Sequence, residues 1–116
     1  MPPAEQSARA LQFLGLAAKA GRVVIGVPLI CTALQRAAKD KTPLLVVKAT
    51  DCSSNTAKRI QDRTAFYGVP LLTLPLTCAQ LAHAIGKKEA LVAAVGVTEK
   101  NLAAAIIAAA GQTQTT

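Results

Sequence analysis

Apolar residues along the chain follow two spacings in turn, one typical of amphipathic helices and one typical of short buried strands. The helical spacing begins with Leu11 and Leu14, and Gly21 supplies a stop signal for that helix. Ser7 belongs to the residue types that cap helix N-termini. The pattern therefore predicts a first helix over residues 8–20.

Short runs of valine, leucine and isoleucine interrupt the helical pattern and predict strands. Pro28 suits the first turn of a helix, and Thr77 suits a cap. Asp51, Ser53 and Ser54 are alternative caps for a helix that ends at Gly68. The predicted strands are 23–25, 44–47, 69–74 and 91–97. The other predicted helices are 28–39, the helix that begins at one of these three caps and ends at Gly68, 77–85 and 98–110.

Single helices separate the predicted strands, and this order defines the fold class. Parallel neighbours need crossover connections, so the order implies a parallel or mixed sheet with helices on both faces. We predict an α/β fold, a three-layer α/β/α sandwich, formed by one domain over residues 1–116. Residues 1–6 and 111–116 are expected to be flexible tails.

The charge balance points to the class of partner. Thirteen Lys and Arg residues against six Asp and Glu residues give a formal net charge of +7. Such a surplus favours a polyanion such as nucleic acid, although positive charge that only aids solubility is the alternative. On the helix that ends at Gly68, the apolar spacing places Ile60 inward and Lys58, Arg59 and Arg63 outward.

Residues for catalysis or metal binding are sparse. His83, the single histidine, lies within a predicted helix, and its spacing from Cys78 puts the two on different helix faces. Asp51 follows a strand, but a capping role is the more common one for such a residue. The three cysteines form no Cys-x-x-Cys pair, which favours reduced thiols in the cytoplasm. We expect no enzymatic activity, no metal, no cofactor, no signal peptide and no membrane span.

Four segments occur in an order that resembles a known family. A helix end, turn and short strand run from Leu14 to Gly26, and three further segments cover residues 49–56, 66–70 and 81–87. Together, from about Leu11 to Leu102, they resemble the bacterial branch of the kink-turn RNA-binding ribosomal-protein family, whose archaeal and eukaryotic members are the L-seven-a-e and L-thirty-e proteins. The resemblance implies an L-thirty-e-like four-stranded mixed sheet and a monomer that binds structured RNA, such as ribosomal RNA or a kink-turn.

The resemblance also implies two surfaces that contact the RNA. One surface receives the kinked duplex at the helix after the first strand, and the other meets a flipped-out base at an apolar loop before the last strand. The loop at 51–54 lies between them. The corresponding residues in this sequence are Gly26, Val27, Pro28, Leu29 and Thr32 for the first surface, Lys87, Lys88, Leu91, Val92 and Ala93 for the second, and Ser53 for the loop.

This sequence departs from the family pattern at the first surface. The better-characterised RNA binders of the family carry Thr-Asn-Glu and then a lysine, where this chain has Val27, Pro28, Leu29 and Thr32. Valine, proline and leucine side chains form no hydrogen bonds, so direct reading of guanine edges by the triad is lost. The alternative function is a protein-interaction module on the same fold.

Several further side chains have two possible roles. The connection at 36–43 is longer than the family's usual turn, and Lys39 and Lys41 in it either contact RNA or are simply solvated. Phe66 is expected to pack in the core, while Tyr67 is open to either role. Val92 either contacts a base or belongs to a buried strand, and a substitution to aspartate separates the two.

Overall fold

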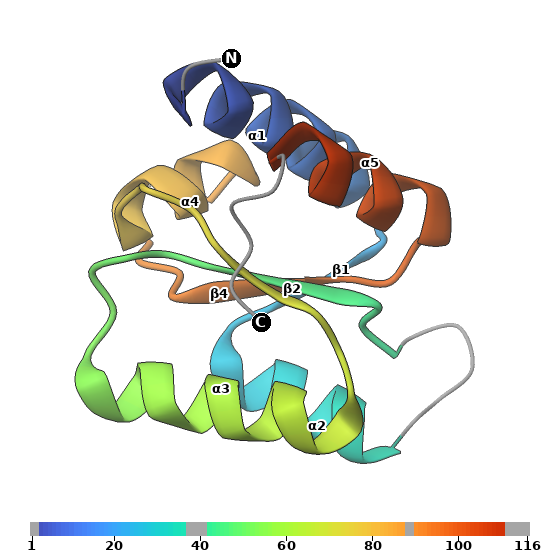
Figure 1. The fold of residues 1–116 in the computed structure, drawn as a ribbon, viewed down its shortest axis with the longest axis vertical. Coiled ribbons are helices and arrows are strands. Elements are labelled where there is room, and N and C mark those ends of the chain that lie inside the picture. Colours follow the sequence, from blue (N-terminus) through green and yellow to red (C-terminus); the bar gives the residue numbers. More distant parts are fainter. Residues whose placement is uncertain (1–2, 37–41, 88–89, 111–116) are drawn as a thin grey trace.

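A computed structural model describes residues 3–36, 42–87 and 90–110 of the chain. Helices and strands alternate through most of the described ranges (Figure 1). In chain order they are α1 (Pro3–Lys19), β1 (Val23–Ile25), α2 (Val27–Arg36), β2 (Leu45–Lys48), α3 (Ser54–Tyr67), β3 (Leu71–Thr73), α4 (Cys78–Ala84), β4 (Ala94–Val97) and α5 (Lys100–Ala110).

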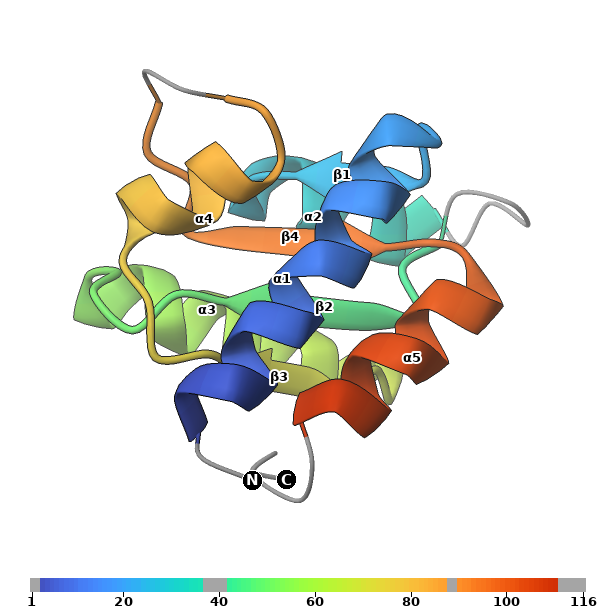
Figure 2. The ribbon, with the colours of Figure 1, turned by 90° about the horizontal axis from the view of Figure 1, so that it is seen from above.

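The elements form three layers, with α2 and α3 on one face of the sheet and α1, α4 and α5 on the other (Figures 1 and 2). The strand order is β1-β4-β2-β3. β4 is antiparallel to both β1 and β2, whereas β2 and β3 are parallel. The predicted α/β/α sandwich with a four-stranded mixed sheet is therefore confirmed.

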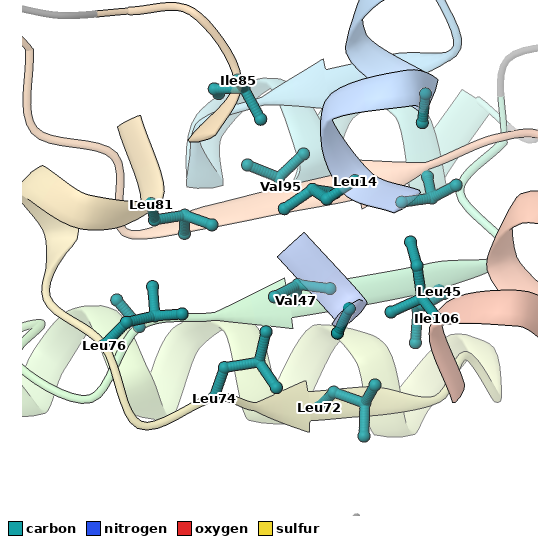
Figure 3. Close-up of a cluster of buried hydrophobic side chains, with 14 of the residues drawn as sticks. Leu14, Leu45, Val47, Leu72, Leu74, Leu76, Leu81, Ile85, Val95 and Ile106 are labelled. Carbon is teal, nitrogen blue, oxygen red and sulfur yellow. The ribbon is translucent and has the colours of Figure 1, made fainter. Parts of the chain in front are cut away.

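The two central strands are buried on both faces. Every residue of β2 and β4 is buried. Because side chains alternate along a strand, Leu45 and Val47 of β2 face the core beneath α1, α4 and α5, and Val46 faces α2 and α3. Figure 3 shows the larger of these two cores, in which Leu14 of α1 and Ile106 of α5 lie over the sheet. The continuous apolar run in β2 follows from this double coverage.

Gly96 of β4 makes room for a close approach on the face toward α2. A Cβ atom at this position would lie 3.0 Å from Cγ of Pro43 and 3.6 Å from Cγ1 of Ile30. Gly96 is paired with Val46 of the neighbouring strand, so the chain cannot easily shift away. The absence of a side chain lets Pro43, which lies just before β2, pack directly onto the sheet.

Several element ends differ from those predicted. α1 begins at Pro3, so Ser7 lies inside the helix, and residues 3–6 of the expected tail are helical. β4 begins at Ala94, and before it the N–H of Val92 donates to the carbonyl of Cys78, outside the sheet. β3 is also shorter than its apolar run. The expected helix 28–39 is helical as far as Arg36, the last described residue of this range, while Lys39, Lys41 and the tail 111–116 lie outside the described residues.

Helix caps follow the sequence signals closely. Ser53 is the N-cap of α3, and its hydroxyl oxygen accepts the N–H of Thr56 at 3.2 Å. Thr77 caps α4 in a reciprocal capping box with Gln80. Gly68 closes α3 in the left-handed conformation with φ of 69°. Of the three alternative caps for α3, the structure therefore selects Ser53.

We expect Gly96→Val to destabilise the protein by about 1–3 kcal/mol, because the new side chain overpacks the contact with Pro43 and Ile30. Gly96→Ala should have a smaller effect in the same direction. Chemical unfolding curves measure both. A valine variant as stable as the wild type would contradict the close approach.

Candidate functional site

A groove of about 610 Å³ lies where three segments that are distant in sequence meet. These segments are the start of α2, the first turns of α3, and the loop that leads into β4. Figure 2 shows the connection from α4 to β4 beside β1, close to this meeting point. The lining residues are Ile25, Gly26, Val27, Pro28, Asn55, Thr56, Arg59, Lys87, Ala90, Leu91, Val92 and Ala93.

Gly26 turns the chain from β1 into α2 in a single residue. Its φ of 94° is in the region that favours glycine. Its N–H donates to the carbonyl of Ala94 at 3.0 Å, and its own carbonyl accepts the N–H of Ile30 at 3.0 Å. The start of α2 is thus attached to the start of β4. Val27 is buried and Pro28 is exposed, so the rim of the groove here is proline ring and helix backbone.

The loop before β4 is anchored by Val92 and presents Leu91. Val92 is 5% exposed and packs in the larger core, and its N–H donates to the carbonyl of Cys78 at 3.2 Å. The carbonyl of Ala93 accepts the N–H of Ala49 at 3.0 Å. Leu91, in contrast, is 79% exposed. An apolar surface offered by this loop to a ligand is therefore mainly that of Leu91.

Three residues of α3 complete the groove and were not among the predicted site residues. Asn55, Thr56 and Arg59 line its far wall. The helical spacing already placed Arg59 on the outside of α3, opposite the buried Ile60. The family resemblance places the preceding loop, 51–54, between the two expected surfaces, but it does not indicate which side chains of α3 line the groove, because that depends on how α2 and α3 pack on the same face of the sheet.

Other predicted residues lie outside the groove. Leu29 and Thr32 line a second hollow of about 730 Å³ that runs along β1 and also includes Arg36. Lys87 lines both hollows. Ser53 is exposed and acts as the cap of α3. Lys88 lies outside the described residues.

Asp51 caps a helix other than the one that follows it. Its Oδ1 accepts the N–H of Cys78 at 2.7 Å, at the start of α4. Hydrogen bonds from Cys78 lower the pKa of the Asp51 carboxyl. Burial, followed by the neighbouring Asp51, raises the pKa of the Cys78 thiol to about 11. Cys78 is therefore protonated at neutral pH, a state unsuited to a nucleophile.

The described residues offer little for catalysis. They contain no group of three or more His, Cys, Asp or Glu side chains that could hold a metal ion. His83 is exposed on α4 and does not line the groove. None of the helices in the described ranges is long and apolar enough to cross a membrane. Phe66, expected in the core, is 78% exposed, so that prediction is wrong.

Comparison with known proteins identifies the family. The model of the family described as ribosomal protein L7Ae/L30e/S12e/Gadd45 matches residues 8–107. The chain belongs to this family. It is 36% identical over 95 residues to the RNA-binding protein YlxQ of Bacillus subtilis, covering 82% of this chain and 88% of the relative. It is 30% identical over 79 residues to the YlxQ protein of Enterococcus faecium, covering 68% and 72% of the two chains.

Solved structures of two proteins share the fold. A protein of unknown function from Bacillus halodurans aligns with a TM-score of 0.78 and 26% identity, covering 90% of this chain and 99% of that one. The 15.5-kD RNA-binding protein of Giardia lamblia aligns with a TM-score of 0.75 and 15% identity, covering 93% and 87% of the two chains. The predicted family, in its bacterial branch, is therefore confirmed.

We expect Asp51→Asn to destabilise the protein at neutral pH and to have no effect in strong acid. The lowered pKa means that the ionised carboxylate of Asp51 is more stable in the folded protein than in the unfolded chain, and so stabilises the fold. This stabilisation is complete above the unfolded-state pKa, 3.8, and is lost as the pH falls through the lower folded-state pKa. Thermal melts of both proteins across this range measure the difference. If the difference in melting temperature between the two proteins stayed constant with pH, the Asp51 carboxylate would not be the stabilising group.

Leu91→Asp and Val92→Asp should differ greatly in their effect on stability, although the residues are adjacent. A carboxylate at Val92 would be buried without a partner, so we expect a loss of more than about 3 kcal/mol or an unfolded protein. Leu91→Asp should change the melting temperature little, because Leu91 is exposed. Circular dichroism melts of the two variants provide the test. A stable Val92→Asp protein would show that this loop is not anchored in the core.

Proposed function

We propose that this protein is a non-enzymatic RNA-binding protein that holds structured RNA in the groove between α2, α3 and the loop before β4. The observation that carries the proposal is the groove itself, which combines Arg59, Lys87, the exposed Leu91 and the start of α2. Relatives over most of the chain bear the name RNA-binding protein YlxQ, and the net charge of +7 suits a polyanionic partner.

Each part of the groove suits a different part of an RNA molecule. Arg59 and Lys87 supply cations for backbone phosphates. The start of α2 supplies backbone N–H groups and the positive end of the helix dipole, although Pro28 removes one donor. Leu91 supplies apolar contact for an unpaired base. Most of these interactions recognise the phosphate backbone and the shape of the RNA, and not its base sequence.

Recognition of a kink-turn through guanine edges is weaker in this proposal than in relatives with polar side chains on α2. Val27 is buried, Pro28 carries no side-chain donor, and Leu29 lines the second hollow. Selectivity for kinked RNA would then depend on the shape of the groove. A kink-turn or ribosomal RNA as the partner, a monomeric state and a cytoplasmic location stay predictions.

We expect a kink-turn RNA to bind more tightly than a plain duplex of equal length, and Lys87→Ala to weaken the binding of both. Loss of one phosphate contact should reduce the slope of log affinity against log salt by about 0.7 to 0.9. Fluorescence anisotropy titrations of both RNAs at several salt concentrations measure affinity and slope together.

Lys100→Ala is the matched control, because Lys100 is exposed at the start of α5 on the opposite face of the sheet. This variant should retain the wild-type affinity and slope. Equal binding of the two RNAs would argue against kink-turn recognition. An affinity that does not depend on salt would favour the protein-interaction module instead.

A further inference from the structure

The outer side of α3 carries a row of side chains that continues out of the groove. Arg59 lines the groove, Arg63 follows four residues later, and Phe66 follows three residues after that. On a helix, positions with this spacing lie on one side, with a rise of about 1.5 Å per residue. Arg63 is thus about 6 Å and Phe66 about 10 Å beyond Arg59 along the helix axis. Phe66, the last residue of the row, lies one residue before the end of α3 at Tyr67.

The two arginines of the row have no partner of opposite charge in the described ranges. The ion pair of α3 joins Lys58 to Asp62 at 3.6 Å, with both side chains exposed. Arg59 and Arg63 make no ion pair with any described residue. Arg63 and Arg59 are both exposed. The guanidinium groups of Arg59 and Arg63 are therefore one helical turn apart and face solvent, whereas Lys58 beside them is paired with Asp62.

Phe66 is exposed, and its ring contacts that of its neighbour Tyr67. Its ring meets the ring of Tyr67 with centroids 4.9 Å apart and planes at 84°. Tyr67 is half-buried and packs against the core between α2, α3 and the sheet. A perpendicular contact occupies the edge of one ring and one face of the other, so Phe66 keeps at least one face free. An exposed phenylalanine with a free ring face is suited to stacking on a base.

We propose that the row formed by Arg59, Arg63 and Phe66 extends the RNA-binding surface beyond the groove. The arginines bind successive phosphates of the strand that leaves the groove, and Phe66 stacks on an unpaired base at the far end of α3. Unpaired cations that follow a backbone, combined with an aromatic platform, are the features that single-stranded RNA requires. The row is also continuous with the groove, because Arg59 belongs to both. This inference depends on the RNA-binding function proposed above.

The preferred ligand is therefore a structured RNA whose stem continues into a single strand. The probes are a kink-turn RNA with blunt ends and the same RNA with an unpaired extension on one strand or the other, measured by fluorescence anisotropy at several salt concentrations. The wild type should bind one extended RNA more tightly than the blunt RNA. The variants are Phe66→Ala, Phe66→Trp and Arg63→Ala, with Lys58→Ala as the matched control because it removes a positive charge from the same helix outside the row.

For the extended RNA, Phe66→Ala should weaken binding roughly 5- to 150-fold, as expected for loss of one stacked base, and Phe66→Trp should preserve it. Arg63→Ala should reduce the salt slope by about 0.7, the value for one phosphate of a single strand. For the blunt RNA, these variants should bind like the wild type. Lys58→Ala should match the wild type with both RNAs. Melting temperatures should stay close to that of the wild type, because Arg63 and Phe66 are exposed.

The outcomes separate this inference from the proposed function. If Lys87→Ala weakens binding but Phe66→Ala and Arg63→Ala behave like Lys58→Ala with every RNA, the groove binds RNA and the row does not. The inference is also overturned if the extension adds no affinity in the wild type. If the wild type binds none of these RNAs, the proposed function fails and the inference fails with it.

Discussion

The backbone hydrogen bonds at the entry to β4 are the constraint on which the candidate site depends. Within three residues, the N–H of Val92 bonds to Cys78, the carbonyl of Ala93 bonds to Ala49, and the carbonyl of Ala94 bonds to Gly26. These bonds connect the loop before β4 to the starts of α4 and α2 and to the end of β2. Because β4 is a central strand with both faces buried, the loop and the start of α2 are held by the most protected part of the sheet.

Two adjacent apolar residues of this loop have different roles. Val92 is buried and attaches the loop to the core, and Leu91 beside it is left on the surface. The same division occurs at the end of α3, where Tyr67 packs inward and Phe66 stays exposed. In both places an exposed apolar residue directly precedes one that packs inward. In the proposed function, these exposed side chains supply the apolar contacts for unpaired bases.

Much of the fold was predictable from local signals. The three layers, the helix end at Gly68, and the caps at Ser53 and Thr77 all correspond to patterns in the sequence. Such features depend on the spacing of apolar residues and on groups a few residues apart, so the sequence carries them directly. The ends of β3 and β4 were less predictable. An apolar run continues past the last ladder hydrogen bond whenever the next residues are buried for another reason, as Val92 is.

By itself, the sequence determined the fold class, the family, the basic character of the chain and the segments at the start of α2 and before β4 as candidate sites. Only the tertiary structure decided which residues these segments meet. In the structure, Arg59 lines the groove, whereas Leu29 and Thr32 line a second hollow. Asp51 caps α4, a helix far along the chain. Phe66 is exposed where hydrophobicity alone indicated burial. The reason is physical: spacing along a chain specifies which side chains share a helix or strand face, but the packing of elements distant in sequence specifies what that face touches.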